Sequence, residues 1–371
     1  MATKVIPQAF PPGEFIKEEL EARGWTQGDL AKIMDRQDSV ISAIINGKRA
    51  VSPEVASELA AAFDTSPEVW MNLQTSFNLY SKRERKKDVS RRAQLFSTAP
   101  VKDMIRRGWI KATEDIDALE AEVSAFLSEP ISEIYFHKSQ SQGDISPAQR
   151  AWLCRAHQLA KGIPAAKFSQ SLFEKALNTL RRLFLNPEDV RHVAKVLADS
   201  GVRFLIIESL PHAKIDGACF WLDGSPVIVI TMRYDRLDNF WYILSHECGH
   251  VKYEDGRNGM AILDLNLVGD DRVPFDKKSQ IEQRADLFAE DFLISRVAME
   301  DFVNRLRPLF SKQRIRGFAM KMQVHPAIVL GQLQFRNEVG YFHSREMLVK
   351  VRDIVTTSAL TDGFGQPISL N

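Results

Sequence analysis

The residues best suited to chemistry in this chain are SHECGH, at positions 245–250, where two histidines stand four apart with a glutamate between them. Residues four apart on a helix share one face, so His246 and His250 can direct imidazole nitrogens at one ion. Glu247 lies one step round the helix, where its carboxylate can reach a water beside that ion, as a general base must. The spacing therefore predicts two ligands and the base of a hydrolytic zinc site.

A third ligand is expected from the helical segment IEQRADLFAEDFLI, at 281–294. Glu282 in that segment would complete a His, His, Glu set with a fourth position open, and the alanines after it let two helices approach closely. Asp286, one turn on, is predicted to accept the other ring N–H of one histidine. The alternative for Glu282 is structural, because Ser279 and Glu282 also fit a capping box.

A donor for the oxyanion of the reaction is expected farther along the chain. His325, ahead of Pro326 at a turn, is the candidate catalytic residue, and Tyr341 and His343 are weaker ones. The alternative for His325 is a capping or packing role. Cys248 lies inside the motif but points away from His246, so it is expected to pack rather than bind metal.

After Gly201 the spacing of apolar residues changes from helical to strand-like. This change indicates which elements position the candidate residues. A β-rich run at 202–210 and a second at 217–230, with Asp223-Gly224 as its turn, predict a strand and a hairpin. The SHECGH helix is expected to begin at Asp238 as N-cap. Two further helices are predicted around 279–295 and 315–335, before a weakly patterned tail.

The stretch from Gly217 to about Leu293 resembles the ImmA/IrrE family of zinc metallopeptidases, whose pattern is HExxH followed by a glutamate-led helix. Asp286 stands where the family more often has asparagine, and FLIS lacks the usual proline. QVHPAIVLGQLQ, at 323–334, also resembles a carboxy-terminal segment of the family. The resemblance implies Zn²⁺ held by His246, His250 and Glu282, with Glu247 activating the water.

The amino-terminal region carries a different signal. In TQGDLAKIMDRQDSVISAIINGKR, at 26–49, an amphipathic helix, a short polar turn and a second helix with Val40, Ile41, Ile44 and Ile45 on its buried side predict a helix-turn-helix. The exposed amino-terminal face of the second helix would read base edges, and the basic residues after it would contact phosphates. The candidate DNA contacts are Gln27, Arg36, Gln37, Asp38, Ser39, Ser42, Lys48 and Arg49.

Residues 10–79 resemble the HigA-type antitoxin branch of the xenobiotic-response-element repressors, through PGEFIKEELEARGWTQGDLAKIM, IINGKRAVSPEVASELAAAF and TSPEVWMNLQ. The resemblance implies operator binding as a homodimer and, often, pairing with a cognate toxin. Local charge opposes DNA binding, because residues 10–75 hold eleven acidic and six basic side chains. The basic run at 82–92, net +5, is expected to supply attraction.

Length and composition set the wider frame. With 371 residues, 44% hydrophobic and 26% charged, the chain is predicted to be α+β and mostly α, soluble and cytoplasmic, with no membrane partner. Three scattered cysteines argue against disulfides and a cysteine-built metal site. The predicted regions are a five-helix helix-turn-helix domain at 1–80, a basic linker and helical connector at 81–145, a zincin-like α+β metallopeptidase domain at 146–355 and a tail at 356–371.

Together these patterns predict a DNA-binding regulator or antitoxin-like protein with a zinc-dependent endopeptidase domain that cleaves a protein target. The first alternative is a DNA-binding repressor whose peptidase-like part is a non-catalytic sensor or docking scaffold with structural zinc. The second is an interaction scaffold that binds neither DNA nor zinc. The intact Glu247 favours chemistry, because a structural zinc site has no use for a base.

Overall fold

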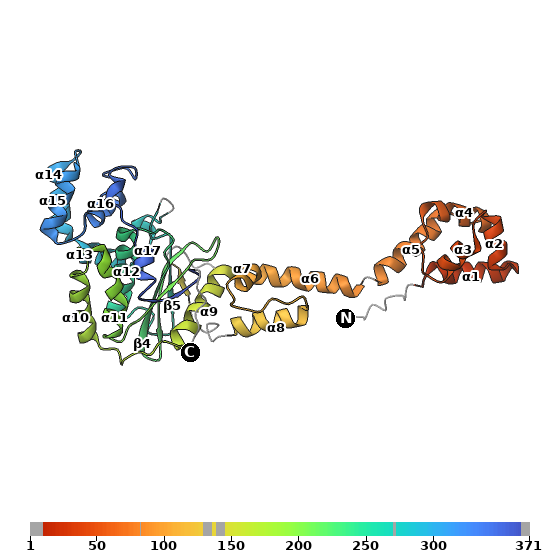
Figure 1. Ribbon diagram of the computed structural model, residues 1–371, viewed down its shortest axis with the longest axis horizontal. Helices are drawn as coiled ribbons and strands as arrows, with labels where there is room; N and C mark the ends of the chain where they lie inside the picture. Colours follow the sequence, from red (N-terminus) through yellow and green to blue (C-terminus); the bar gives the residue numbers. More distant parts are fainter. Residues whose placement is uncertain (1–9, 82, 129–135, 139–144, 270–271, 365–371) are drawn as a thin grey trace. The chain divides into compact units, whose positions relative to one another are not determined.

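The computed structural model describes residues 10–81, 83–128, 136–138, 145–269 and 272–364, in two compact units, Met1–Gln94 and Leu95–Asn371 (Figure 1). The division falls within helix α6 (Arg83–Thr98), whose first turns contain most of the basic run. In the first unit, five helices enclose one apolar core, as predicted. They are α1 (Pro12–Arg23), α2 (Gln27–Ile33), α3 (Asp38–Ile45), α4 (Pro53–Phe63) and α5 (Pro67–Ser81).

Side-chain caps start two of these helices at the residues that the sequence indicates. Thr26 accepts a hydrogen bond from the backbone N–H of Asp29, and the Asp29 carboxylate accepts the N–H of Thr26, which completes a capping box. Ser52 accepts from the N–H of Val55, with proline in the first turn. Each cap satisfies a donor that would otherwise be orphaned, which is worth about 1 kcal/mol.

The second unit is built on a six-stranded mixed sheet of order β1-β5-β3-β4-β2-β6. β3 runs antiparallel to both β4 and β5, and the other three pairings are parallel. Asp223 and Gly224 turn the β3–β4 hairpin, both with positive φ, as the aspartate-glycine signal predicts. The strands are β1 (Phe136–Lys138), β2 (Arg203–Ile207), β3 (Ile215–Leu222), β4 (Ser225–Ile230), β5 (Ala261–Leu265) and β6 (Leu360–Asp362).

Helices cover both faces of this sheet, so its central strands are buried on both sides. Along β2, Phe204 and Ile206 join one apolar core, and Leu205 and Ile207 join the other. The α-helices are α7 (Val101–Arg106), α8 (Ile116–Leu127), α9 (Pro147–Lys161), α10 (Gln170–Arg181), α11 (Val193–Ala198), α12 (Leu237–Lys252), α13 (Gln280–Leu293), α14 (Arg296–Leu306), α15 (Lys312–Met322), α16 (Pro326–Phe335) and α17 (Arg352–Val355). Short 3-10 helices are η2 (Pro187–His192), η3 (Phe275–Lys277) and η4 (Arg345–Met347). No helix in the described ranges is long and apolar enough to span a bilayer.

The regions expected to form a connector and a tail both take part in the second unit. Trp109, between α7 and α8, stacks on Phe126 and donates its indole N–H to Asp362 on β6. Arg155 on α9 donates to the same carboxylate. The three-residue strand β6 pairs with β2, and a strand that short has too little alternation to stand out in the sequence. The rest of the expected tail, 365–371, lies outside the described residues.

The helices differ from the prediction in three ways. α12 begins one residue before Asp238, which is therefore in the first turn and binds Arg236. The segment expected to form one helix at 315–335 forms α15 and α16, because Gln323 is left-handed and Pro326 starts a new helix. α14 was not expected. The three cysteines are free and buried, in line with the packing role predicted for them.

Candidate functional site

Close packing of α12 against α13 brings together the three side chains predicted to bind metal. A Cβ at Gly249 would lie 3.2 Å from the Cα of Ala285, so the two helices approach as the small residues suggest. The His246 and His250 Nε2 atoms lie 3.1 Å apart. A Glu282 carboxylate oxygen lies 3.2 Å from His246 Nε2, and its other oxygen lies 3.8 Å from His250 Nε2. All three residues are fully buried.

The capping alternative for Glu282 explains the hydrogen bond of its backbone N–H but not the position of its carboxylate. Ser279 is the N-cap of α13, and its hydroxyl accepts the N–H of Glu282. The Glu282 carboxylate points to the two histidines instead of completing a capping box, and one of its oxygens has no hydrogen-bond partner among the described residues. A buried carboxylate with an unsatisfied oxygen is costly unless a cation or donor reaches it.

A fourth residue, Asp264 on β5, joins this group and was not predicted. Its carboxylate oxygens lie 3.6 Å from His246 Nε2 and 3.5 Å from His250 Nε2. Asp264 is fully buried, and neither oxygen has a hydrogen-bond partner in the described part of the chain. The available signal was one aspartate inside the apolar run AILDL, where an unpaired charge is expensive.

The four side chains match the donor set and size of a zinc site. Two imidazoles and two carboxylates suit Zn²⁺, and ligands at about 2.0–2.1 Å in a tetrahedron lie about 3.3 Å from one another. The separations above run from 3.1 to 3.8 Å, and all four ligand atoms lie within 4.8 Å of one another. A divalent cation would also neutralise carboxylate oxygens that are otherwise without partners.

Glu247 lies beside this cluster, and its carboxylate occupies the space that a side chain at residue 217 would fill. A Cβ at Gly217, on β3, would be 2.0 Å from Glu247 Oε1, at the point where the β3–β5 register is irregular. Burial and then the charge of Asp264 raise the pKa of Glu247 well above its ordinary value, against the lowering effect of the histidines. Both carboxylate oxygens are buried without a hydrogen-bond partner among the residues described. The carboxylate is thus free to exchange a proton with a water at the cluster.

Two further carboxylates orient the histidine rings. Asp286 lies 3.0 Å from His246 Nδ1, although the ring is poorly aligned for a hydrogen bond. Asp255, which was not predicted, is hydrogen-bonded to His250 Nδ1 at 3.1 Å. Burial lowers the pKa of His250, but Asp255, Asp264 and Glu282 outweigh it and raise the pKa to about 10. Each imidazole therefore has a carboxylate behind it, which turns its Nε2 toward the cluster.

The three candidate oxyanion donors lie elsewhere. His325 is the N-cap of α16, where its Nδ1 accepts the N–H of Ala327, and burial lowers its pKa. Among the described residues, the hydrogen bonds of His325 include those with Ala327 and Phe184 and none with the metal-binding side chains. This favours the capping alternative, and the catalytic role of His325 stays a prediction. His343 contacts the Phe310 carbonyl, and Tyr341 lines a separate cavity.

In the first unit, α2 and α3 form the predicted helix-turn-helix, with α3 in the position of the reading helix. Ile41, Ile44 and Ile45 are buried, and Val40 packs against them. The outer side chains at the start of α3 are exposed, as are those beyond its end. The exposed or partly exposed candidate DNA contacts are Gln27, Gln37, Asp38, Ser39, Ser42, Lys48 and Arg49.

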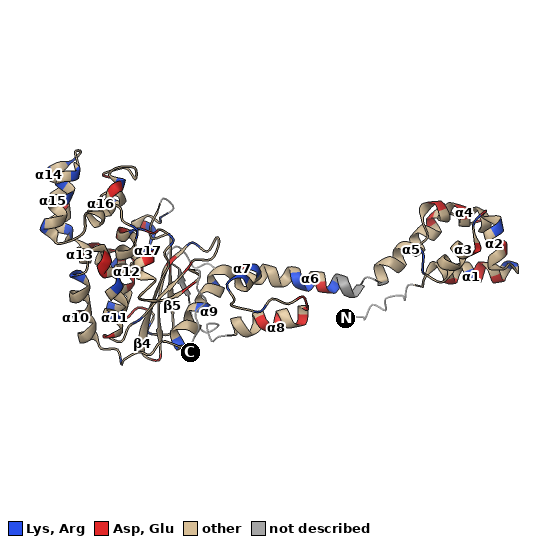
Figure 2. Ribbon diagram, viewed as in Figure 1, with Lys and Arg blue, Asp and Glu red and all other residues tan. Residues whose placement is uncertain are grey.

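Arg36 differs from the other candidate contacts because it is engaged within the unit. Its guanidinium donates to both carboxylate oxygens of Glu58 on α4 and lies 3.6 Å from Glu54. Such a two-bond pair fixes the guanidinium in one orientation. Arg36 thus tethers the turn to α4, and the DNA contact expected of it stays a prediction. In Figure 2 the acidic residues of α1 and α4 are coloured red on the ribbon; they contribute to the excess of acidic over basic residues in 10–75.

Comparison with known proteins assigns both units. Residues 16–70 match the helix-turn-helix family, and residues 199–315 match the IrrE N-terminal-like domain family of M78 peptidases. The regulator YddM of Escherichia coli is 34% identical over 84 residues, 23% of this chain and 88% of YddM. Antitoxin HigA-1 of Vibrio cholerae is 40% identical over 74 residues, 20% of this chain and 70% of the antitoxin.

Among solved structures, a HigA-family antidote protein from Coxiella burnetii is 30% identical, covering 22% of this chain and 89% of its own, with a TM-score of 0.21. Fold and comparisons define a DNA-binding helix-turn-helix regulator fused to an M78-type peptidase domain. The chain belongs to the HigA-type helix-turn-helix family through its first unit. In its second unit, residues 199–315 match the IrrE N-terminal-like domain.

Proposed function

We propose that the protein is an operator-binding repressor whose second unit is a zinc-dependent endopeptidase. The observation that carries the peptidase half is Glu247, a buried carboxylate beside a convergent set of metal-binding side chains. A zinc site that serves only structure has four protein ligands and needs no base next to them. The match to an M78 peptidase family supports the same reaction class.

The residues of the chain divide the chemistry between them. His246, His250 and Glu282 would hold Zn²⁺, which when bound polarises a scissile carbonyl and acidifies water. Glu247 takes a proton from the attacking water on its carboxylate and delivers it to the leaving amine. Asp286 and Asp255 keep the imidazole Nε2 atoms directed inward. Cleavage of a partner regulator by this domain would relieve repression.

Asp264 favours a second candidate, a non-catalytic sensor or docking domain with a closed metal site. Its carboxylate lies against both histidines, where it would supply a fourth protein ligand. Catalytic zinc sites keep one position for water, and closed sites do not. The two functions therefore differ in whether Asp264 remains on the metal.

Zinc content and proteolysis, measured together, separate these candidates. The peptidase proposal expects wild-type protein loaded with one zinc to hydrolyse quenched fluorescent casein, and Glu247→Gln to keep the zinc and lose the hydrolysis. The closed site expects no hydrolysis by wild type and a tenfold or greater loss of zinc affinity in Asp264→Ala. His246→Ala should lose zinc under both, and equal zinc in that variant would defeat the site.

The DNA half of the proposal rests on α3, whose exposed residues stand where a reading helix presents side chains to the major groove. We infer a second copy of the chain on a two-fold operator and, because one relative is named an antitoxin, a toxin as a further partner. A gel shift with DNA from upstream of the gene tests recognition, with Gln37→Ala and Ser39→Ala as variants and Lys17→Ala on α1 as control. No shift at low salt with wild type would overturn the proposal.

A further inference from the structure

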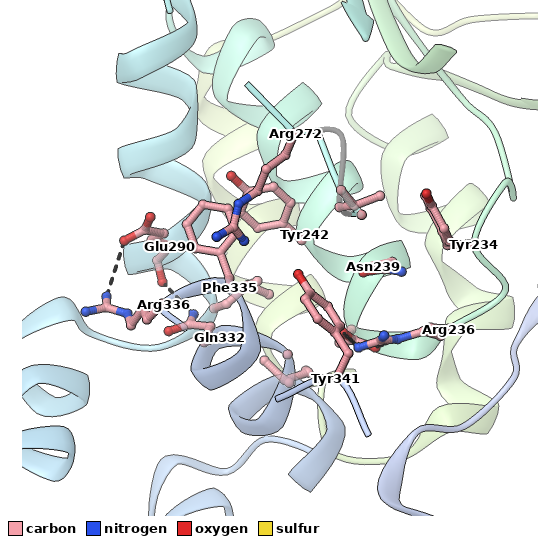
Figure 3. A pocket seen from close by; sticks show the side chains of 16 residues that line it. Tyr234, Arg236, Asn239, Tyr242, Arg272, Glu290, Gln332, Phe335, Arg336 and Tyr341 are labelled. Carbon is pink, nitrogen blue, oxygen red and sulfur yellow. Dashed lines mark hydrogen bonds and ion pairs between the residues drawn. The ribbon is translucent and has the colours of Figure 1, made fainter. Parts of the chain in front are cut away.

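A cavity separate from the metal cluster lies between α12, α13 and α16, with a volume of about 190 Å³ (Figure 3). Four aromatic residues line it, Tyr234, Tyr242, Phe335 and Tyr341, together with aliphatic and polar side chains. Small-molecule sites in proteins have this character, a mainly apolar wall with a few placed polar groups. An apolar cavity of about 150 Å³ can hold benzene, so this one has room for a single substituted ring.

Three arginines line the cavity, and one of them makes no ion pair with the residues that the structure describes. Arg236 makes two hydrogen bonds to Asp238, and Arg336 pairs with Glu290 at 3.3 Å. Arg272 has no ion pair among the described residues; its guanidinium lies 4.3 Å from the Phe335 ring centroid, and its buried Nη1 has no hydrogen-bond partner there. Among the described residues the wall therefore carries one positive charge without an ion-pair partner, which suits a monoanion.

A second unsatisfied group belongs to another residue of the cavity wall. Gln332 is 7% exposed and lines the cavity. Its amide nitrogen donates to the Glu290 carbonyl, while its Oε1 is buried without a hydrogen-bond partner in the described ranges. A buried amide oxygen without a donor costs about 1–3 kcal/mol, which a ligand hydroxyl or N–H would recover.

We propose that this cavity binds a small aromatic carboxylic acid that carries a hydroxyl group. The carboxylate pairs with Arg272, whose planar fork matches it in two hydrogen bonds. The ring packs among the tyrosines and Phe335, and the hydroxyl donates to Gln332 Oε1. A phosphate monoester suits the wall less well, because its second negative charge has no free cation to meet.

The site is placed to influence the metal cluster, though its binding requires neither metal nor hydrolysis. Tyr242 lines the cavity, and its hydroxyl donates to Asp286 at 2.9 Å. The same Asp286 oxygen lies 3.0 Å from His246 Nδ1. A ligand that contacts Tyr242 is thus two contacts away from a metal-binding imidazole.

Calorimetric titration of the full-length protein with 4-hydroxybenzoate tests the proposal, with neutral 4-hydroxybenzamide as the matched ligand. Wild type should bind the acid with a Kd below about 1 mM and prefer it to the amide. Arg272→Gln should weaken acid binding at least tenfold and leave amide binding unchanged. Arg257→Gln removes an exposed arginine that lies over Trp221 in the same manner and serves as control.

Gln332→Leu provides a second test that does not depend on the charge. It should abolish the preference for 4-hydroxybenzoate over benzoate and keep benzoate affinity. Binding should be equal in wild type and Glu247→Gln, so a failed peptidase proposal leaves this one standing. No saturable binding of the acid by wild type, or equal binding by Arg272→Gln, would overturn it.

Discussion

At the scale of single residues, the position of Glu247 beside the metal-binding side chains depends on Gly217, which has no reactive group of its own. Gly217→Ala would place a methyl group 2.0 Å from the present position of Glu247 Oε1, in a buried space where the carboxylate must move. We expect casein hydrolysis to fall at least tenfold, because the base is displaced, with zinc content unchanged. Zinc analysis beside the hydrolysis assay measures both.

The control for that change is Gly317→Ala on α15, where a Cβ would meet no atom within 4 Å. This variant should hydrolyse casein as wild type does. If Gly217→Ala also retained full hydrolysis, Glu247 would have no role that depends on its position.

Asp255 gives a second prediction at this scale. Asp255→Asn weakens the acceptor of the His250 Nδ1 hydrogen bond, and loss of such an outer carboxylate typically lowers metal affinity 10–100-fold. Competition with a zinc chelator measures the change. Asp223→Asn, in the exposed β3–β4 turn, should leave the affinity as it is, and an equal fall in both variants would point to general destabilisation.

The cluster was only partly predictable from sequence, for a physical reason. His246, His250 and Glu247 share a helix, so a local period places them, and Glu282 stands out on a second helix with small residues around it. Asp264 and Asp255 come from a strand and from a loop after α12. Their positions follow from sheet register and chain reversal, which no local period encodes.

At the scale of elements, the helix-turn-helix depends on the close contact of α1 with α3. A Cβ at Gly13 would lie 2.0 Å from the Ile45 carbonyl oxygen, so Gly13→Ala forces the two helices apart. We expect a loss of about 1–3 kcal/mol in the stability of the first unit. Thermal unfolding followed by circular dichroism measures it.

Gly28→Ala, in α2, is the matched control because its Cβ would meet only ordinary van der Waals contacts. Alanine favours a helix over glycine by up to about 1 kcal/mol, so this variant should be as stable as wild type or more so. Equal losses of thermal stability in both variants would show that the stability of the first unit does not depend on the close α1–α3 contact.

The sequence predicts these elements well where caps and turns are local. Thr26, Ser52 and Asp223-Gly224 fix helix starts and a hairpin through bonds to neighbouring residues. β5 and β6 were missed because each gains its stability from a distant strand. Helix α14 follows α13 without a strong stop signal between them.

At the scale of the whole molecule, charge governs how the protein finds DNA. Residues 10–75, which include the helix-turn-helix, hold eleven acidic and six basic side chains and so offer few phosphate contacts. The salt dependence of operator binding should therefore be shallow. Replacing Lys48 and Arg49 together by alanine should weaken binding to every DNA sequence alike and lower the salt slope by about 2. Fluorescence anisotropy over a range of salt concentrations measures the slope.

Arg36→Ala separates a charge effect from a structural one. Because Arg36 is held by Glu58, its loss should lower the melting temperature of the first unit and leave the salt slope of the folded protein unchanged. A slope reduced without destabilisation would place Arg36 among the DNA contacts.

The strand β6 has a consequence for how the chain is made. Asp362 anchors it to Trp109 and Arg155, so the sheet of the second unit cannot close until a ribosome has synthesised almost every residue of that unit. The core of the first unit is complete some 280 codons earlier, by Ser81. Interrupted translation would therefore release a fragment with a complete first unit and no folded second unit; if the proposed function holds, that fragment keeps the DNA-binding part without the peptidase.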